Sequence, residues 1–391
     1  MDKIGIFGGS FNPPHLGHIQ AARYAIEALS LDKLLLVPSG KTPQKAVSGG
    51  MATGEQRLKM LSIVAESKME VCSLEVDRAG ESYTWDTVRA LQQEYPDAEF
   101  TLLLGTDMFL KFHEWKDAEK IAGCVTLAAL RRGEKKEAQA IADTARALTD
   151  RGARVRLLEN PVFPISSTQV RRLLAFEGAG DFVPGALLDY IRKEGLYYVG
   201  RDLKHLPMEE LQKVVVDLLN PNRVRHVLGC RDTAVALAEK WGADPVDAGR
   251  AGLLHDITKA LDGPLQLTLC GAYGKLLDDF SRKYPKTLHA LTGSLVAERI
   301  FGENRAVVSA IESHTTGKAN MNLLETIIYV ADYMEPNRDF PGVEALRTLA
   351  FADIRGALKL GLEMTMEHLK DQGCEISPAS RDALLYLNQK G

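Results

Sequence analysis

Cysteine is scarce in this chain, and its few thiols are dispersed. The 391-residue sequence contains five cysteines, an odd number, and no Cys-x-x-Cys pair. Neither a disulfide framework nor a thiolate zinc site is indicated, because both need thiols that occur in sets. This cysteine content is typical of a protein of the reducing cytoplasm, and we expect a cytoplasmic location.

A surplus of positive charge and a long apolar run are also missing. The 48 Lys and Arg residues are balanced by 52 Asp and Glu residues, which gives a formal net charge of −4. A protein dedicated to the nucleic-acid backbone needs a basic surplus, so we predict no nucleic-acid partner. No segment approaches the roughly 20 apolar residues of a membrane span, and the N-terminus enters a Gly-rich turn instead of the apolar core of a signal peptide. We therefore expect small substrates and no membrane association.

The first half of the sequence alternates two kinds of segment. Short apolar runs of the kind that form buried parallel strands occur at residues 4–7, 34–37, 71–74, 100–104, 125–128 and 155–158. Amphipathic stretches of helical period lie at residues 19–29, 57–65, 84–92 and 134–148. This alternation predicts an α/β, doubly wound parallel sheet of the Rossmann-like type.

The second half has a different pattern. Beyond Tyr198, the residues Gly200, Pro207 and Pro221 separate mostly helical segments, and apolar residues from Val224 onward recur with helical spacing. The length of the chain suits two or three domains of roughly 100–200 residues. We predict an α/β domain over residues 1–200 and an all-α domain over residues 208–391.

The first predicted strand leads directly into a turn rich in glycine, proline and histidine. The turn reads Gly8-Gly-Ser-Phe-Asn-Pro-Pro-His-Leu-Gly-His18, and a helix is expected to begin near Gly17. The carboxyl ends of parallel strands face the ligand crevice, and the N–H groups of a helix start attract phosphate. His15 and His18 are three residues apart, so both can point into the same space and donate hydrogen bonds to phosphate oxygens. The turn therefore predicts a nucleotide-phosphate site.

The turn from Gly8 to His18 resembles the His-x-Gly-His signature of the nucleotidylyltransferase superfamily. A second segment, Ile165-Ser-Ser-Thr-Gln-Val-Arg171, is similar to that family's Ile-Ser-Ser-Thr-x-x-Arg element, in which hydroxyls, helix-start amides and an arginine hold the ATP triphosphate. The resemblance implies catalytic roles for His15 and His18. It also implies that ATP, as its Mg²⁺ complex, is bound by Gly8, Gly9, Ser10, Phe11, His15, His18, Gly105, Asp107, Ile165, Ser166, Ser167 and Arg171.

Over residues 1–198 the sequence resembles nicotinate-nucleotide adenylyltransferase more narrowly. The similar segments are Tyr83–Arg89, Gly105–Met108 and Trp115. Contact with the acceptor, nicotinate mononucleotide, is implied for Lys45, Thr84, Trp115 and Arg131. The indole of Trp115 would stack on the pyridine ring. Two positions depart from the family pattern, since Gln44 replaces a histidine and Arg132 replaces a proline.

The reaction implied by this resemblance is attack of the acceptor's phosphate on the α-phosphorus of Mg-ATP. It gives deamido-NAD and pyrophosphate without a covalent intermediate, and His15, His18, Lys45 and Arg171 would neutralise the developing charge. One alternative is an adenylyltransferase for phosphopantetheine, whose domain is typically shorter and does not need the segments at Thr84, Asp107 and Trp115. Pyrophosphate release with each acceptor distinguishes the two.

The helical half concentrates histidine. His226, His255, His289 and His314 are four of the nine histidines, and Asp256 and Asp332 lie in similarly apolar contexts. Burying a carboxylate without a partner is costly, and a divalent cation removes that cost. Nitrogen and oxygen ligands without thiolate suit Fe, Mn, Mg or Zn. The pattern predicts a metal site.

These residues resemble the His-Asp metal-dependent phosphohydrolase superfamily. His226, His255, Asp256 and Asp332 match its shared ligand positions, and His289 and His314 match the histidines that complete a two-metal site in some members. The segments 314–317 and 328–338 are similar to the bacterial subfamily that hydrolyses diadenosine tetraphosphate to two ADP. The resemblance implies two divalent cations, iron or alternatively manganese, bridged by a catalytic Asp256. Lys259 is a candidate phosphate contact.

Two other interpretations of the helical half stay open. It is a hydrolase for a different nucleotide, which would share every ligand, or it is a regulatory module that senses a nucleotide without cleaving it. The sequence also leaves open the native metal, the choice of nicotinate over nicotinamide, coupling between the two sites, and assembly into a homo-oligomer.

Overall fold

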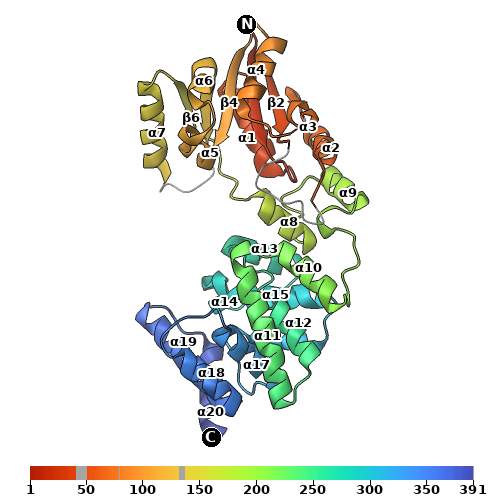
Figure 1. Ribbon diagram of the computed structural model, residues 1–391, viewed down its shortest axis with the longest axis vertical. Helices are drawn as coiled ribbons and strands as arrows, with labels where there is room; N and C mark the ends of the chain where they lie inside the picture. The colour runs from red at the N-terminus through yellow and green to blue at the C-terminus, as the bar shows by residue number, and fades with distance from the viewer. Residues whose placement is uncertain (41–50, 79, 132–136, 391) are drawn as a thin grey trace. The chain divides into compact units, whose positions relative to one another are not determined.

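A computed structural model describes residues 1–40, 51–78, 80–131 and 137–390 of the chain. The chain divides into two compact units, Met1–Gly200 and Arg201–Gly391 (Figure 1). The first unit contains a sheet with helices packed alongside it, and the second is built from helices in the residues described. None of the described helices is both long and apolar enough for a membrane span.

The first unit is organised around a six-stranded sheet. All neighbouring strands pair in parallel, in the order β3-β2-β1-β4-β5-β6. The strands are β1 (Lys3–Gly9), β2 (Lys33–Pro38), β3 (Met69–Val71), β4 (Glu99–Gly105), β5 (Thr126–Leu130) and β6 (Arg154–Leu158). The predicted α/β doubly wound fold is confirmed.

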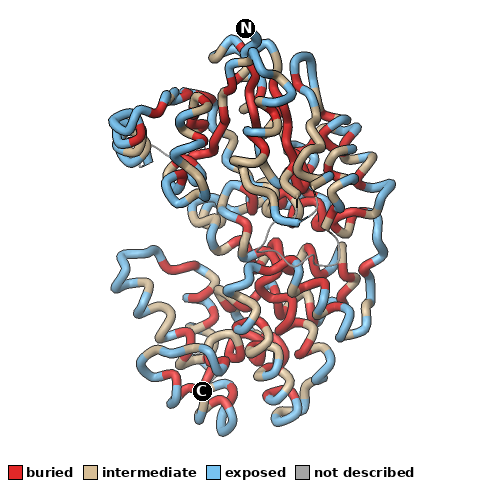
Figure 2. The backbone as a smooth tube through the Cα atoms, turned by 45° about the horizontal axis from the view of Figure 1, so that its top comes forward, coloured by how far each residue is buried: buried red, intermediate tan, exposed pale blue. Residues whose placement is uncertain are grey.

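The centre of the sheet is buried, as the burial colours of Figure 2 show for its strands. This agrees with the continuous apolar runs that predicted β1, β2, β4 and β5, since strands covered on both faces need no polar alternation. Two details of the prediction are wrong. The run at residues 71–74 ends as a strand at Val71, and Leu74 begins a short helix. The run at residues 155–158 lies at the edge of the sheet, where Leu157 is 44% exposed.

Helices connect the strands and cover the sheet. They are α1 (Leu16–Ala28), α2 (Gly54–Val64), α3 (Leu74–Asp77), α4 (Thr84–Glu94), α5 (Thr106–Leu110), α6 (Ala118–Cys124), α7 (Ala138–Asp150), α8 (Ser167–Ala175) and α9 (Gly185–Lys193). Val88, Leu91, Phe109 and Ile121 from these helices are buried against strand residues such as Leu102 in one apolar cluster. Burial of these apolar side chains supplies the main stabilisation of the unit.

The order of the strands determines where a ligand can bind. From β1 the chain adds β2 and β3 on one side, and it then returns to add β4, β5 and β6 on the other side. The point between β1 and β4 is therefore a topological switch point, and ligands of doubly wound sheets bind at the carboxyl ends of the strands there. The turn after Gly9 and the turn after Gly105 flank this point.

The second unit consists of packed helices. They are α10 (Met208–Leu218), α11 (Val224–Trp241), α12 (Pro245–Leu254), α13 (Gly263–Ala272), α14 (Asp279–Lys283), α15 (Leu288–Arg299), α16 (Arg305–Ser313), α17 (Leu323–Met334), α18 (Val343–Ala352), α19 (Ile354–Asp371) and α20 (Pro378–Lys390). Asp or Asn side chains accept N–H groups at the starts of several of them, including α12 at Asp244 and α17 at Asn322. Most of α17 is buried, so it lies at the centre of the unit.

Helices α11 and α12 cross closely at Gly252. A Cβ atom added to Gly252 would lie 2.8 Å from the Cα atom of Arg231, a distance that no side chain tolerates. The close crossing brings the N-terminal part of α11, with His226, toward His255, which directly follows α12. The glycine therefore positions two candidate metal ligands.

Gly252→Ala is expected to destabilise the helical unit by about 2 kcal/mol, since overpacking against a backbone forces the two helices apart. Calorimetry of the full chain measures the loss of stability. The transition of the helical unit is the one whose midpoint rises when divalent metal is added. Gly271→Ala in α13 is the matched control, because its added Cβ would meet nothing within 4 Å. Equal midpoints for the two variants would show that the close crossing is not required.

Candidate active sites

The histidine turn of the first unit lies at the carboxyl end of β1. His15 precedes α1 and His18 lies in its first turn, with ring centroids 3.7 Å apart. The backbone N–H of His15 donates to Nδ1 of His18 at 3.3 Å. The buried ring of Phe11 lies 5.0 Å from the ring of His18 and supports it. Both imidazoles therefore share one space, as their spacing in the sequence predicts.

The two motifs of the first unit contact each other although they are far apart in the sequence. Ser167, at the start of α8, donates a hydrogen bond to the carbonyl oxygen of Pro13 at 2.9 Å. Arg171 donates from Nη1 to the carbonyl oxygen of Asn12 at 2.6 Å. The hydroxyl of Tyr197 also donates to the side-chain oxygen of Asn12. The hydroxyl-rich helix start and the histidine turn therefore lie side by side.

The other predicted nucleotide contacts lie around the same edge of the sheet. Gly105 ends β4, and Asp107 is exposed in the first turn of α5. Arg131 directly follows β5 and pairs with Glu159 at 2.5 Å. Gly8 has open space in front of it, since an added Cβ would meet nothing within 4 Å.

The predicted acceptor contacts come from separate elements of the first unit. Thr84 begins α4, and Trp115 packs against Phe112 with ring centroids 5.5 Å apart. Lys45 lies outside the described residues. These roles stay predictions.

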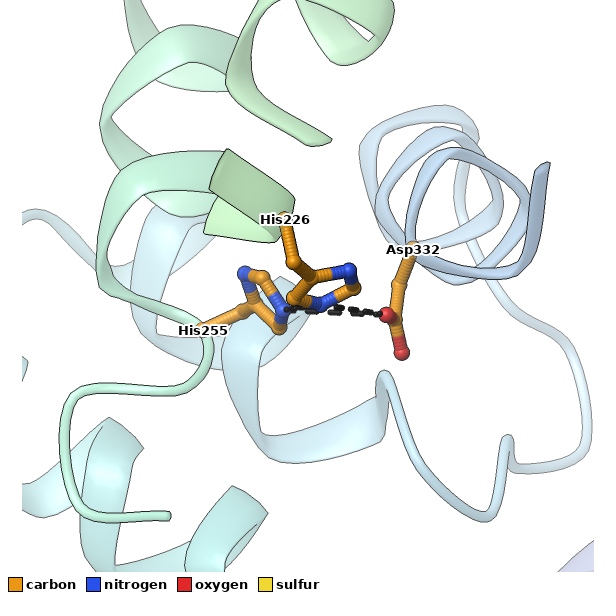
Figure 3. A group of neighbouring side chains, drawn as sticks. All are labelled: His226, His255 and Asp332. Carbon is orange, nitrogen blue, oxygen red and sulfur yellow. Dashed lines mark hydrogen bonds and ion pairs between the residues drawn. The ribbon is translucent and has the colours of Figure 1, made fainter. Parts of the chain in front are cut away.

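The helical unit brings its candidate metal ligands together from several helices. His226 lies in α11, His255 follows α12, and Asp332 lies in the last turn of α17, and the three side chains point toward one another (Figure 3). Nε2 of His226 lies 3.1 Å from Oδ1 of Asp332 and 3.2 Å from Nε2 of His255. These three residues form a group whose ligand atoms all lie within 4.8 Å of one another.

Asp256 connects this group to two further histidines. Its Oδ2 atom lies 3.6 Å from Nε2 of both His226 and His255. Its Oδ1 atom lies 3.5 Å from Nε2 of His289 and 3.7 Å from Nε2 of His314. A carboxylate that presents one oxygen to each of two ligand groups suits a bridge between two cations.

The outer nitrogens of the four histidines are held by oxygen atoms. Nδ1 of His255, His289 and His314 lies 2.7–2.9 Å from the carbonyl oxygen three residues earlier in each case. Nδ1 of His226 lies 3.1 Å from Oε1 of the buried Glu335. When Nδ1 donates to these oxygens, the neutral ring presents the lone pair of Nε2 to the site.

Burial keeps several of these rings neutral. It lowers the pKa of His255 and of His289 well below the ordinary value, and it lowers the pKa of His314 to about 4. Burial opposes ionisation of Asp332, but its close contacts with His226 and His255 and the charge of Arg338 hold the pKa of its carboxyl well below the ordinary value. Neutral imidazole and ionised carboxylate are the forms that bind metal, so these residues fit a divalent cation.

The comparisons with known proteins divide the chain in two. Residues 6–173 match the cytidylyltransferase-like family, and residues 223–337 match the HD domain. A protein of Neisseria meningitidis named probable nicotinate-nucleotide adenylyltransferase is 33% identical over 201 residues, which are 50% of this chain and 99% of the relative. One of the same name from Gloeobacter violaceus is 38% identical, over 51% of this chain and 97% of the relative. Through its first half, the chain belongs to the nicotinate-nucleotide adenylyltransferase family.

This adenylyltransferase family member also carries an HD domain. A Mycoplasma pneumoniae protein named probable nicotinate-nucleotide adenylyltransferase/Ap4A hydrolase is 28% identical over 377 residues, which are 93% of this chain and 98% of the relative. A crystal structure of a predicted HD superfamily hydrolase involved in NAD metabolism from Clostridium acetobutylicum is 36% identical, with a TM-score of 0.46, over 48% of this chain and 99% of that chain. The two family matches and the Mycoplasma relative confirm the two-part composition that the sequence predicts.

Two residues of the HD domain contact the candidate metal ligands but had no role assigned to them from the sequence. Glu335 orients His226, and Arg223 forms an ion pair with Asp256. Glu335 lies three residues beyond Asp332, so its proximity to the ligand group was a usable signal. Arg223 gives no comparable signal, because one charged residue before a helix is normally solvated.

Glu335→Gln is expected to weaken metal binding about tenfold, since loss of a carboxylate behind a metal-binding histidine typically costs 10–100-fold in affinity. Competition of the purified protein with a chelating dye for Mn²⁺ measures the affinity. Glu367→Gln is the matched control, because Glu367 is exposed. Unchanged affinity in Glu335→Gln would contradict the role of Glu335 in orienting His226.

Proposed function

We propose that the chain is a bifunctional enzyme. The first unit transfers AMP from ATP to nicotinate mononucleotide, and the helical unit hydrolyses diadenosine tetraphosphate symmetrically to two ADP. The observation that carries the proposal is the presence of two separate sets of catalytic-type side chains on one chain: the histidine turn beside the Ser-Ser-Thr helix start, and the four histidines around Asp256. The Mycoplasma relative, whose name joins both activities, supports it over nearly the whole length.

In the first unit, side chains of the protein position the two substrates and neutralise charge on the phosphates. The acceptor's phosphate oxygen attacks the α-phosphorus of ATP, and the bond from that phosphorus to the pyrophosphate oxygen breaks. Nδ1 of His18 accepts an N–H, so the neutral ring carries its proton on Nε2 and can donate it to a phosphate oxygen. Mg²⁺ bound with ATP supplies further neutralisation. His15, Arg171 and the start of α8 stabilise the developing charge in the same way.

The remaining predicted residues of this unit would bind the substrates. Gly8, Gly9, Ser10 and Phe11 form the turn over which the nucleotide lies, and the other ATP contacts are Gly105, Asp107, Ile165, Ser166 and Ser167. The acceptor would contact Lys45, Thr84, Trp115 and Arg131. The indole face would stack on the electron-poor pyridine.

In the helical unit, His226, His255, His289, His314, Asp256 and Asp332 would hold two divalent cations, with iron or manganese the proposed metals. Bound cations supply Lewis-acid polarisation of phosphate and a water of lowered pKa. The two oxygens of Asp256 face the histidine Nε2 atoms of both ligand groups. Lys259 lies beside the site, and burial lowers the pKa of its ammonium to about 8. It would contact phosphate.

The first experiment is a product assay on the purified full-length protein. It is given diadenosine tetraphosphate with Fe(II), Mn²⁺, Mg²⁺ or chelator in turn, and ADP, AMP and ATP are resolved by chromatography. Metal-dependent formation of ADP alone is expected. Binding without turnover would assign the unit to nucleotide sensing, and turnover of another nucleotide would change the substrate.

The first unit is tested by pyrophosphate release. We expect release with ATP and nicotinate mononucleotide and little with ATP and phosphopantetheine. Comparison with nicotinamide mononucleotide measures the selectivity of the acceptor site. Release with phosphopantetheine alone would contradict the proposed acceptor.

A further inference from the structure

The histidine turn of the first unit contains a residue in an uncommon backbone conformation. Phe11 has a φ of +44°, in the left-handed region that bulky side chains rarely adopt. Its buried ring contacts the ring of Phe7 edge-on, with centroids 5.5 Å apart, and lies 5.0 Å from the ring of His18. Such a conformation persists only where neighbouring groups hold it. The backbone at Phe11 therefore controls the ring that supports the His18 imidazole.

Arg57 holds the peptide group that leads into Phe11. It lies in α2, and its Nη1 atom donates to the carbonyl oxygen of Ser10 at 3.0 Å, across 47 positions of sequence. This carbonyl belongs to the planar peptide between Ser10 and Phe11. The hydrogen bond therefore fixes the direction from which the chain enters the left-handed residue.

Tyr197 and Arg171 hold the residue that follows Phe11. Tyr197, in the short 3-10 turn Leu196–Tyr198, donates from its hydroxyl to Oδ1 of Asn12. Arg171 of α8 donates to the backbone carbonyl oxygen of Asn12 at 2.6 Å. Burial raises the pKa of the Tyr197 hydroxyl, which keeps it protonated as a donor. Donors from three separate elements thus hold Phe11 on both sides.

The burial of Arg57 is unusual for a charged side chain. The residue is 8% exposed, and burial lowers the pKa of its guanidinium. In the part of the chain that the structure describes, it forms no ion pair, and its hydrogen bond goes to the carbonyl oxygen of Ser10. Burying a cation without an ion pair costs free energy, so apolar packing alone would favour a neutral side chain here. The contact with Ser10 is therefore the feature that a guanidinium adds at this position.

We propose that Arg57 and Tyr197 are positioning residues for adenylyl transfer, which act through Phe11 to set the orientation of the His18 imidazole. Neither side chain has to touch a substrate. The inference rests on the proposed role of His18 in the transfer. Loss of either donor should lower the rate of the transfer more than it weakens the binding of ATP.

The first test compares Arg57→Met with Arg57→Lys in the full chain. Methionine keeps an unbranched stem but has no donor, so kcat with ATP and nicotinate mononucleotide should fall at least about tenfold, because a small misplacement of a reacting group can cost about 10²-fold. The KM for ATP should change less than about threefold, as for an interaction made in the transition state. Arg57→Lys retains a donor and should recover most of the lost kcat. Lys59→Met is the matched control, because Lys59 is exposed on the same helix.

A second variant protects the test against misfolding. Tyr197→Phe removes one hydroxyl and keeps the buried ring. Its kcat should fall about fivefold, the effect of one hydrogen bond, again with little change in the KM for ATP. Higher KM values with unchanged kcat in Tyr197→Phe and Arg57→Met would overturn the proposal.

The tautomer of His18 gives a measurement that is independent of turnover. Because Nδ1 of His18 accepts the N–H of His15, the neutral ring carries its proton on Nε2. NMR of protein labelled with ¹⁵N-histidine should show this tautomer in the wild type, with the His18 signals assigned by their loss in His18→Ala. Arg57→Met should show an average of the two tautomers.

An unchanged His18 tautomer in both Arg57→Met and Tyr197→Phe would overturn the proposal, whatever their rates. This outcome can be told apart from failure of the proposed reaction. If the wild-type protein releases no pyrophosphate with any acceptor, the proposed transfer fails, while the tautomer still decides whether Arg57 and Tyr197 set the orientation of His18.

Discussion

His18→Ala is expected to lower the rate of adenylyl transfer about 10²–10³-fold and to leave hydrolysis of diadenosine tetraphosphate unchanged. A preorganised donor aimed at developing charge contributes on this order. His18 is preorganised on two sides, because its Nδ1 atom accepts the N–H of His15 and its ring packs against Phe11. The measurement is pyrophosphate release at saturating ATP and nicotinate mononucleotide, with ADP formation followed in the same preparation.

The control for this variant is His113→Ala. The side chain of His113 is 61% exposed, so its removal should change neither rate. The kinetic pattern is informative as well. If His18 acts on the transition state, kcat and kcat/KM should fall together, whereas a higher KM with unchanged kcat would place His18 in ground-state binding only.

Asp256→Asn should impair hydrolysis of diadenosine tetraphosphate and leave adenylyl transfer unchanged. We expect hydrolysis to fall about 10³-fold or more, because the loss of several kcal/mol of metal-based stabilisation corresponds to that factor. The two carboxylate oxygens of Asp256 lie 3.5–3.7 Å from four histidine Nε2 atoms. The bound metal, measured by elemental analysis after dialysis, should fall with the rate, and adenylyl transfer should be unaffected.

Asp339→Asn is the matched control for Asp256→Asn. Asp339 is exposed in the same unit, and its replacement should preserve both activities and the metal content. Full metal content with lost hydrolysis would limit Asp256 to a role in the reaction itself. Loss of both activities from either His18→Ala or Asp256→Asn would contradict two independent sites.

Much of the first unit was predictable because its signals are local. Continuous apolar runs such as that of β4 identify buried strands, and the His15 and His18 spacing identifies one face of a helix start. The errors arose where burial depends on neighbours. The apolar run of β6 lies at the sheet edge, so Leu157 is exposed although its local pattern is that of a central strand.

The sequence by itself determined the α/β and all-α classes, the histidine turn, and the identity of the candidate metal ligands, because each depends on a short pattern. It also contained the orientation of three of the ligands, since Nδ1 of His255, His289 and His314 bonds a carbonyl only three residues away. Only the tertiary structure decided that Arg171 contacts the histidine turn, that Glu335 orients His226, and that Asp256 lies between two histidine groups. These contacts join residues distant in sequence, and their formation depends on how whole helices pack.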